Sequence, residues 1–399
     1  MEIMTVFIDG LKPESIKHMD FMSTFSSKGR IKTELGYSNP CHASMYSGVY
    51  PNKHLYWFIW KYSPNTSPFK WLNSMKMMND SENIILKYGA FKLSKIFSSK
   101  KVTSYFGIQF LPKIPLKVWP NFDVTEKKYW TEDNYIKNYP TIFEILRHYE
   151  KPFQVVGLKG DLSKSSVLVE KHQPMSTESQ WLYYFIGDID PMSHKYGQNS
   201  PVTIAQLKKI DQILERKYKL FENDATDPVF MLFSDHGHIN VKKEISMHLI
   251  FSKYNKRLAD YVHFIDANYI RFWFRSDYEE KEVRNILSDL NDIGFILTEK
   301  KLQNYNINMP DNRYGDLVFY LDAPYIFGPS EFYIKSKKFG SRVASMHGYL
   351  PDYTESDGVI ISNRGIIRNE IKLEDITPTI ISGLEIDVPE YMDGEAIWK

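Results

Sequence analysis

The chain has 399 residues, 43% of them hydrophobic and 25% charged, which is enough to bury one large core or two smaller ones. Its 50 basic and 49 acidic residues give a net charge of +1, which excludes the basic surface of a dedicated nucleic-acid-binding protein. One cysteine excludes an internal disulfide framework and any metal site built from several cysteines.

The sequence contains no run that approaches the roughly 18 to 20 consecutive apolar residues needed to span a bilayer. The first ten residues, MEIMTVFIDG, lack the basic region and the cleavage site of a signal peptide. They predict a β-strand that begins close to residue 1. We therefore expect a cytoplasmic protein without a membrane span.

Three apolar runs that end in polar clusters predict buried strands. In chain order they are IMTVFID ending at Asp9, WLYYFIGDID ending at Asp190, and VFMLFSDH reaching Asp235 and His236. Runs without polar alternation are typical of parallel strands that are buried on both faces. Residues 201–222, between the second and third runs, repeat apolar side chains every three or four residues, as an amphipathic helix does. This strand–helix–strand order predicts an α/β fold, in which the acidic clusters gather at one edge of the sheet.

Two regions interrupt this pattern. Residues 60–135 contain the turn-forming stretches PNTSPFKW and LPKIPLKVWP and predict a long insertion. Residues 255–340 predict a small inserted α+β cap, with strands YIRFWF, GFILTE and DLVFYL and a helix between the first two. The core, 1–254 and 341–399, then resumes with strand GVIIS and helix DITPTIISGL.

The stretch YSNPCHASMYSGVYP, residues 37–51, places three reactive side chains within five positions. Cys41 beside a histidine is a candidate thiolate nucleophile. Ser38 is the other candidate, and this stretch alone does not decide between them. His42 completes the group.

Aspartate and histidine are ordinary ligands of zinc, and the sequence offers six of them, most near the ends of predicted strands. Two ions about 4 Å apart form a clamp for phosphoryl transfer, in which Ser38 needs no histidine base. The six candidate ligands are Asp9, Asp190, His194, Asp235, His236 and His347.

Five motifs, in order along the chain, resemble those of the type I phosphodiesterase/nucleotide pyrophosphatase family of the alkaline phosphatase superfamily. They are FIDG, SNPCHASMYSGVYPNKH, DIDPMSHKYG, FSDHG and MHGY, followed by DITPTI as the superfamily's last helix. The resemblance covers roughly residues 1–60, 140–250 and 340–399. It implies an alkaline-phosphatase-like core with a mostly parallel sheet flanked by helices.

The resemblance also implies a function. Ser38 falls on the nucleophile position, and Cys41 on a variable position that we interpret as a packing residue. The implied ligands are Asp9, Ser38, Asp235 and His236 for one Zn²⁺, and Asp190, His194 and His347 for the other. We expect hydrolysis of a small phosphodiester or nucleotide substrate through a phosphoserine-type intermediate, with no stable nucleic-acid complex.

The chain departs from the family where an asparagine about twenty residues after the nucleophile binds a phosphate oxygen, because Ile59 lies near that place. Asn39 or a backbone amide is a possible substitute. Trp57, in the run YWFIW, is predicted either to stack on a flat leaving group or to fill a hydrophobic core.

Three other functions are alternatives to this one. A sulfatase requires an arginine where His42 stands. A phosphomonoesterase or phosphonate hydrolase on the same core would use an arginine clamp, for which Arg313 and Arg342 are candidates. A binding protein that had lost the chemistry would lack some of the ligands, and all are present.

Overall fold

The computed structural model describes residues 1–74, 84–97, 116–158, 167–172, 180–328 and 343–398. The chain forms two compact units, and each is described by itself. Unit 1 comprises Met1–His54, Trp130–Asn240 and Ala344–Lys399, and unit 2 comprises Leu55–Tyr129 and Val241–Val343. Most of the predicted insertion, 60–135, and most of the predicted cap, 255–340, thus belong to one unit.

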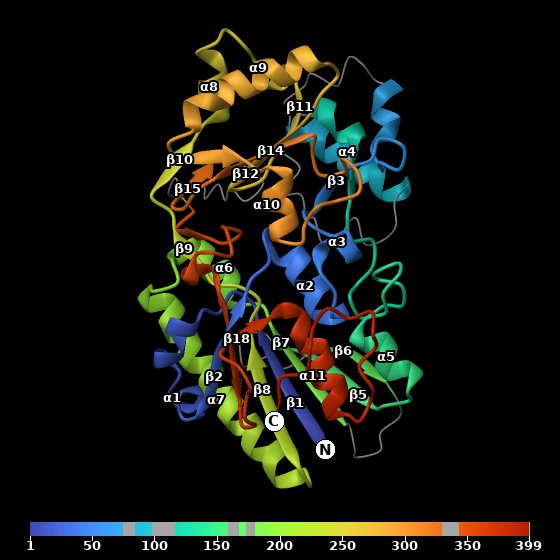
Figure 1. The fold of residues 1–399 in the computed structure, drawn as a ribbon, viewed down its shortest axis with the longest axis vertical. Helices are drawn as coiled ribbons and strands as arrows, with labels where there is room; N and C mark the ends of the chain where they lie inside the picture. Colours follow the sequence, from blue (N-terminus) through green and yellow to red (C-terminus); the bar gives the residue numbers. More distant parts are fainter. Residues whose placement is uncertain (75–83, 98–115, 159–166, 173–179, 329–342, 399) are drawn as a thin grey trace. The chain divides into compact units, whose positions relative to one another are not determined.

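Unit 1 contains an eight-stranded, mostly parallel sheet (Figure 1). Strand β1 (Glu2–Ile8) lies near its middle and pairs in parallel with β7 (Trp181–Ile186) and β8 (Pro228–Phe233). These three correspond to the apolar runs that end in polar clusters, and the predicted strand GVIIS is β17 (Gly358–Ser362). In sheet order the strands are β18 (Glu370–Lys372), β2 (Ser27–Lys32), β17 (Gly358–Ser362), β8, β1, β7, β5 (Phe153–Leu158) and β6 (Val167–His172).

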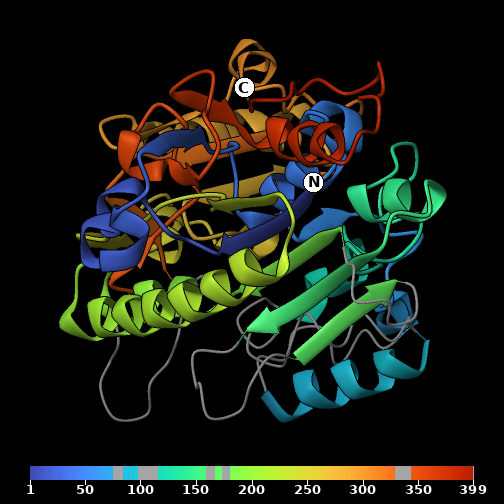
Figure 2. The same ribbon diagram turned by 90° about the horizontal axis from the view of Figure 1, so that it is seen from below.

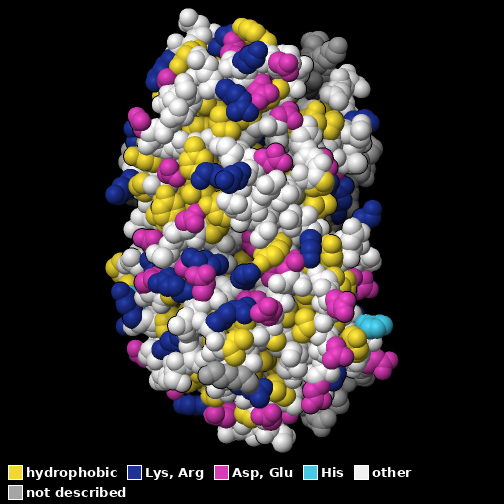
Figure 3. Space-filling model, viewed as in Figure 1, with side chains coloured by type: hydrophobic (Ala, Val, Ile, Leu, Met, Phe, Trp, Pro, Cys, Tyr) yellow, Lys and Arg dark blue, Asp and Glu magenta, His cyan; other side chains and the backbone are white. Residues whose placement is uncertain are grey.

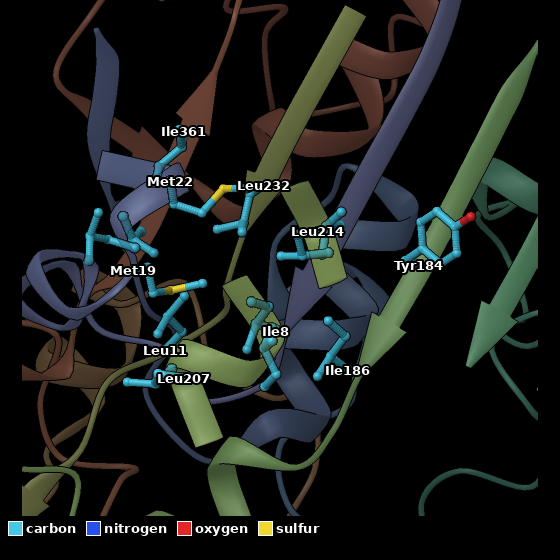
Figure 4. Packing of buried hydrophobic residues seen from close by; sticks show 14 of the residues in the cluster. Ile8, Leu11, Met19, Met22, Tyr184, Ile186, Leu207, Leu214, Leu232 and Ile361 are labelled. Atoms are coloured by element: carbon cyan, nitrogen blue, oxygen red, sulfur yellow. The ribbon is translucent and has the colours of Figure 1, made fainter. Parts of the chain in front are cut away.

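Both faces of this sheet are covered, which explains why its strands read as continuous apolar runs. Val6 and Ile8, even-numbered residues of β1, belong to one cluster with Leu207 and Leu214 of helix α7 (Pro201–Asp224), and Figure 4 shows the last three. On the other face, Phe7 contacts His42 of helix α2 (Ser38–Ser47). Helix α7 therefore covers one face and α2 the other. Figure 2 shows the long helix α7 and the red C-terminal helix α11 (Ile376–Gly383) on opposite sides of the sheet.

The helices of unit 1 include the two that the sequence predicted. Predicted residues 201–222 lie in α7 (Pro201–Asp224), and DITPTIISGL contains α11 (Ile376–Gly383). The other α-helices are α1 (Asp20–Ser23), α2 (Ser38–Ser47), α3 (Pro51–His54), α5 (Ile142–His148) and α6 (Ile189–Tyr196). The 3₁₀ helices are η1 (Pro13–His18), η9 (Thr354–Ser356) and η10 (Leu373–Asp375). With the sheet, they confirm the predicted α/β class.

Unit 2 is built around a four-stranded antiparallel sheet in the order β11-β12-β14-β13. Its strands are β11 (Val262–Ile265), β12 (Tyr269–Trp273), β13 (Gly294–Ile296) and β14 (Leu317–Leu321). The predicted strands YIRFWF, GFILTE and DLVFYL contain β12, β13 and β14. The helix predicted between the first two is α9 (Asp277–Leu287).

Shorter elements complete unit 2. The remaining strands pair as β3 (Trp60–Tyr62) with β4 (Phe122–Val124), and β10 (Lys243–Ile245) with β15 (Tyr325–Phe327). The helices are α4 (Ile84–Phe97), α8 (Met247–Ser252), α10 (Glu299–Asn304), η2 (Lys70–Ser74), η5 (Leu116–Asn121), η7 (Leu258–Asp260) and η8 (Ser288–Leu290).

A buried arginine shows why distant chain segments share unit 2. Arg271 of β12 is paired with Asp266, its Nε lying 2.5 Å from Oδ2, and its Nη1 donates to the carbonyl of Trp60 at 2.8 Å. A buried guanidinium needs such partners, because burying it without them costs several kcal/mol. The aromatic rings of Trp60 and Phe122 pack with those of Phe264 and Trp273 around it.

The exposed surface agrees with the mixed charge of the sequence. Basic and acidic side chains are interspersed over the face shown in Figure 3. Within the part of the chain that the structure describes, no helix combines the length and the apolar character needed to cross a bilayer.

Candidate active site

The site is built where three neighbouring strands of unit 1 end. In the parallel registers, Ile8 of β1 aligns with Ile186 of β7, and Phe7 aligns with Phe233 of β8. The chain therefore leaves all three strands at the same edge of the sheet, with Asp9 directly after β1. The amide of Asp9 extends the ladder by donating to the carbonyl of Ile186 at 3.0 Å.

Helix α2 brings Ser38 to this edge. Ser38 is the first residue of the helix, which follows the extended Tyr37 and ends at Gly48 in the left-handed conformation. The Ser38 hydroxyl lies 3.2 Å from His236 Nε2. One turn later, His42 Nε2 lies 3.5 Å from Asp235 Oδ2. The nucleophile candidate and the predicted ligands of the first ion thus meet.

The first predicted metal group consists of Asp9, Asp235 and His236, whose ligand atoms all lie within 4.8 Å of one another. His236 Nε2 is 3.5 Å from Asp9 Oδ1 and 3.4 Å from Asp235 Oδ2. His236 Nδ1 lies 3.2 Å from the carbonyl of Gly237 and must donate to it, because a carbonyl only accepts. In a neutral ring, the Nε2 lone pair therefore faces the carboxylates and Ser38.

The second predicted group consists of Asp190, His194 and His347, again within 4.8 Å of one another. Asp190 and His194 lie four residues apart on α6, so they share one face of the helix. His194 Nε2 is 3.2 Å and His347 Nε2 is 3.5 Å from Asp190 Oδ1. His347 follows the short strand β16 (Ser345–Met346), which pairs with β9 (Ile239–Asn240) just after the third strand end.

The two groups adjoin each other. The rings of His236 and His347, one from each group, stack in parallel with their centroids 3.8 Å apart. Two carboxylate–imidazole groups side by side resemble the arrangement in which two metal ions act on one phosphoryl group.

Burial and neighbouring charges shift the pKa values of these groups in different directions. Burial, with the charges of Asp235 and Asp190, raises the pKa of Asp9 well above its ordinary value. Burial would also raise the pKa of Asp190, but His194, His238 and His347 hold it well below its ordinary value. Burial lowers the pKa of His347, so this imidazole is neutral and able to ligate a cation at neutral pH.

A cation would compensate two buried carboxylate oxygens here. Asp9 Oδ1 and Asp235 Oδ2 are buried and have no hydrogen-bond partner among the described residues. Leaving a carboxylate oxygen buried without a hydrogen bond is costly, and a divalent cation would compensate it. Oxygen and nitrogen donors of this kind suit zinc. The residues present therefore fit the predicted ions.

The other predicted residues lie in separate environments. Asn39 is buried on α2 beside Ser38, and its role in phosphate binding stays a prediction. Trp57 belongs to unit 2, where it is 2% exposed and packs against Phe58, Tyr269 and Tyr314. Such burial favours the packing interpretation of Trp57, because little of the ring is open to a ligand.

The remaining candidates also have defined places. Cys41 is fully buried beside Thr33, and burial raises the pKa of its thiol well above the ordinary value, which suits a packing residue. Arg313 of unit 2 is paired with Asp311, its Nε lying 2.7 Å from Oδ1. Arg342 lies outside the described residues.

One histidine near Asp190 lies directly after the FSDHG motif and is not among the six predicted ligands. His238 is the second histidine of SDHGH, and its Nε2 lies 3.0 Å from Asp190 Oδ1. Burial lowers the pKa of His238 to about 4. The His-x-His spacing after a buried strand was the available signal, since alternate residues of an extended segment point to the same side.

The sequence of the chain matches a known protein family. The family model for type I phosphodiesterase / nucleotide pyrophosphatase matches residues 4–349. No curated protein sequence matches the chain.

Solved structures with the same fold include two of ectonucleotide pyrophosphatase / phosphodiesterase 5. The murine protein is 12% identical with a TM-score of 0.63, and covers 98% of each chain. The human protein is 11% identical with a TM-score of 0.64, and covers 99% of this chain and 97% of its own. A third match is an inactive variant of the murine protein in complex with AMP, at 12% identity, a TM-score of 0.62, and 98% and 97% coverage.

Proposed function

Because the chain belongs to the type I phosphodiesterase / nucleotide pyrophosphatase family, we propose that it is a two-zinc hydrolase of phosphodiester or pyrophosphate bonds. The substrate class is a nucleotide or a similar small diester, and the reaction passes through a covalent intermediate on Ser38. The proposal assigns Asp9, Ser38, Asp235 and His236 to one ion. It assigns Asp190, His194 and His347 to the other.

The observation that carries this proposal is the position of Ser38. Its hydroxyl lies 3.2 Å from His236 Nε2, at the N-terminus of a ten-residue helix and beside two adjoining carboxylate–imidazole groups. A serine in that position serves covalent phosphoryl transfer, for which a nucleophile must approach phosphorus while the developing charge is neutralised.

The chain's own groups have distinct tasks in this reaction. Ser38 Oγ attacks phosphorus, forming one P–O bond while the bond to the leaving group breaks, and on balance the hydroxyl proton of Ser38 leaves with the departing group. Water then cleaves the Ser38–phosphorus ester and restores the hydroxyl. Asp9, Asp235 and His236 would bind the ion beside Ser38. His42 contacts the Asp235 carboxylate through Nε2. Zinc, when bound, supplies charge neutralisation and Lewis acidity at the reacting oxygens.

Two observations support a nucleotide-type diester. A solved structure of the murine relative carries AMP, which shows that this fold accepts a nucleoside monophosphate group in that protein. Around Ser38, the residues Tyr37 and Asn39 are uncharged. A diester carries one negative charge at phosphorus and depends less on added cations than a monoester, which carries nearly two.

A direct comparison of substrates tests the proposal. We expect kcat/KM for a nitrophenyl phosphodiester or a nucleotide diester to exceed that for nitrophenyl phosphate by at least about tenfold, roughly 1.4 kcal/mol of transition-state preference. A reversed preference would support the phosphomonoesterase alternative instead. Absence of turnover on all phosphate and phosphonate esters by zinc-loaded protein would contradict hydrolase activity.

A further inference from the structure

His238 has the environment of a metal ligand although it belongs to neither predicted group. Its side chain is fully buried, and its two ring nitrogens each meet one polar side chain. Nε2 lies 3.0 Å from Asp190 Oδ1, and Nδ1 lies 3.2 Å from the hydroxyl of Ser345. Because a metal would approach His238 through one of these nitrogens, the location of the hydrogens decides whether it can ligate.

The hydrogen bonds of Ser345 determine whether Nδ1 of His238 carries a hydrogen. The Ser345 hydroxyl has one hydrogen, and it lies 2.6 Å from the carbonyl of Ser193, which can only accept. The hydroxyl therefore donates to Ser193 and can only accept from His238. It follows that His238 Nδ1 carries a hydrogen and donates to Ser345, which leaves the lone pair of a neutral ring on Nε2.

Ser345 also fixes the tautomer of the predicted ligand His194. His194 Nδ1 donates to the backbone carbonyl of Ser345 at 3.0 Å, and its Nε2 lies 3.2 Å from Asp190 Oδ1. Metal-ligating histidines usually donate their second ring N–H to such an outer partner, which fixes the tautomer. Ser345 thus orients two imidazoles toward Asp190, one with its carbonyl and the other with its hydroxyl.

The approach of His238 to Asp190 then requires a positive charge. The Nε2 lone pair and the carboxylate oxygen are both acceptors, and two acceptors 3.0 Å apart repel each other unless a proton or a cation lies between them. Nitrogen and oxygen ligands of one zinc ion lie about this far apart, given bonds of roughly 2.0–2.2 Å to the ion. Ligand atoms of Asp190, His236 and His238 also lie within 4.8 Å of one another.

The backbone leaves room for this arrangement at Gly10. Gly10 has a φ of +72°, and a Cβ atom there would lie 3.0 Å from His238 Nε2 and 3.2 Å from Asp190 Cα. The absence of a side chain at Gly10 therefore permits the contact between His238 and Asp190.

We propose that His238 is a further metal ligand, binding through Nε2 an ion that Asp190 also binds, with Ser345 as the positioning residue that fixes its tautomer. The site would then use four histidines rather than three. The inference rests on the proposed function only in requiring a metal ion at Asp190, and it can fail while that function stands.

Cadmium-113 NMR tests the proposal without any activity measurement. The full-length chain, loaded with ¹¹³Cd²⁺, should show scalar couplings from cadmium to the rings of four histidines. His238→Gln should show three, because glutamine has no imidazole. His263→Gln is the matched control, since His263 is also buried and donates Nδ1–H to a carbonyl, that of Tyr261. It should keep all four couplings.

The possible outcomes separate this inference from the proposed function. Three coupled histidines in both the wild-type chain and His238→Gln would overturn the inference and leave the two-metal hydrolase intact. It would mean that a proton lies between His238 and Asp190. If no histidine couples to cadmium, both proposals fail.

A second variant tests the role of Ser345 even if His238→Gln does not fold. Ser345→Ala removes the hydroxyl and keeps the carbonyl that orients His194. We expect the affinity for zinc, measured by competition with a chelator, to fall by about tenfold or more, as for other partners of ligating histidines. Ser345→Thr keeps a hydroxyl and should restore most of the affinity. Unchanged affinity in Ser345→Ala would overturn the positioning role.

Discussion

At the level of single residues, Ser38 is the group whose loss should affect turnover most. Ser38→Ala removes the only atom that we propose to bond to phosphorus, while the neighbouring carboxylates and imidazoles remain. We expect kcat to fall by about a thousandfold or more and the zinc content to stay close to that of the wild-type chain. Steady-state kinetics and elemental analysis of the same preparations would measure the two quantities.

Cys41→Ser is the matched control for the nucleophile. Cys41 lies on the same helix but is buried against Thr33, so its thiol is not available to a substrate. This variant should keep most of the wild-type kcat/KM. Loss of activity in Cys41→Ser together with an active Ser38→Ala would show that the thiol, not the hydroxyl, is the nucleophile.

Gly10 allows a second test at this scale. A Cβ atom there would crowd His238 and Asp190 in a left-handed backbone conformation that costs roughly 1–2 kcal/mol for a residue with a side chain. Gly10→Ala should therefore lower both the stability and the affinity for zinc, measured by denaturation and by chelator competition.

Gly89→Ala is the control substitution for Gly10→Ala. Gly89 lies within helix α4, and a Cβ atom there would meet nothing within 4 Å. Alanine is favoured over glycine inside a helix by about 1 kcal/mol, so this variant should be as stable as the wild-type chain or more so. Equal effects of the two substitutions would contradict the crowding argument.

The sequence allowed the six Asp and His residues to be proposed because each directly follows an apolar run or lies in a recognisable motif. It gave no role to His238, because that role depends on the hydrogen bond from Ser345 and on the pairing of β16 with β9. Neither is visible in local spacing. Trp57 shows the same limit, since an aromatic run looks alike whether it faces a ligand or fills a core.

At the level of elements, the packing of helix α2 on η10 encloses two acidic side chains. Glu34 precedes α2 and Glu374 lies on η10, and both are buried. Burial, followed by the charge and hydrogen bond of Glu374, raises the pKa of Glu34 well above 4.5. Burial likewise raises the pKa of Glu374. These directions predict that the folded chain keeps a proton on the pair to a higher pH than the unfolded chain does.

This pair should make stability depend on pH. The folded-state pKa values lie above the unfolded ones, so the folded chain binds more protons, and its stability falls as pH rises from about 4.5 through the folded pKa. Glu34→Gln imitates the protonated carboxyl and should remove much of this loss. Between pH 5 and pH 9, urea denaturation should show the wild-type chain losing about 1 kcal/mol or more relative to the variant.

Glu222→Gln provides the comparison for the buried pair. Glu222 is exposed near the end of α7 and accepts a hydrogen bond from the hydroxyl of Tyr218. The stability of the Glu222→Gln variant should depend on pH as that of the wild-type chain does. If Glu34→Gln also follows the wild-type curve, the two carboxyls do not share a proton.

Helices were predictable where apolar residues lie on one side, and strands where apolar residues form a continuous run. The runs that became β1, β7 and β8 are examples, because burial on both faces leaves no polar alternation. The registers were not predictable, since a one-residue slip changes no local propensity. These registers are what align the three acidic clusters at one edge of the sheet.

At the level of the whole molecule, bound metal should contribute to stability. Ions that bind only the folded chain stabilise it by about 2.7 kcal/mol per site when free metal exceeds the dissociation constant a hundredfold. Removal of metal with a chelator should abolish turnover and lower the melting temperature, and zinc should restore both. Elemental analysis should find close to two zinc ions per chain. Full activity without a bound transition metal would contradict the two-metal mechanism.

The two-unit organisation was the part of the architecture that local patterns described least. The sequence predicts residues 60–135 and 255–340 as an insertion and a cap, and both lie mostly in unit 2. Arg271 joins the two segments through Asp266 and the carbonyl of Trp60, and such a partner cannot be read from the chain. The spacing of neighbouring residues in the sequence does not predict a long-range contact of this kind.

Unit 1 is assembled from three stretches of chain, with all of unit 2 inserted between them. During synthesis the ribosome therefore releases Asp9 and Ser38 first, then Asp190 to His238, and His347 only after the whole of unit 2. Until that last stretch emerges, the carboxylates at the sheet edge lack one imidazole, and β16 is not present to align His238. The proposed metal centre can therefore be completed only after the last of these segments has emerged.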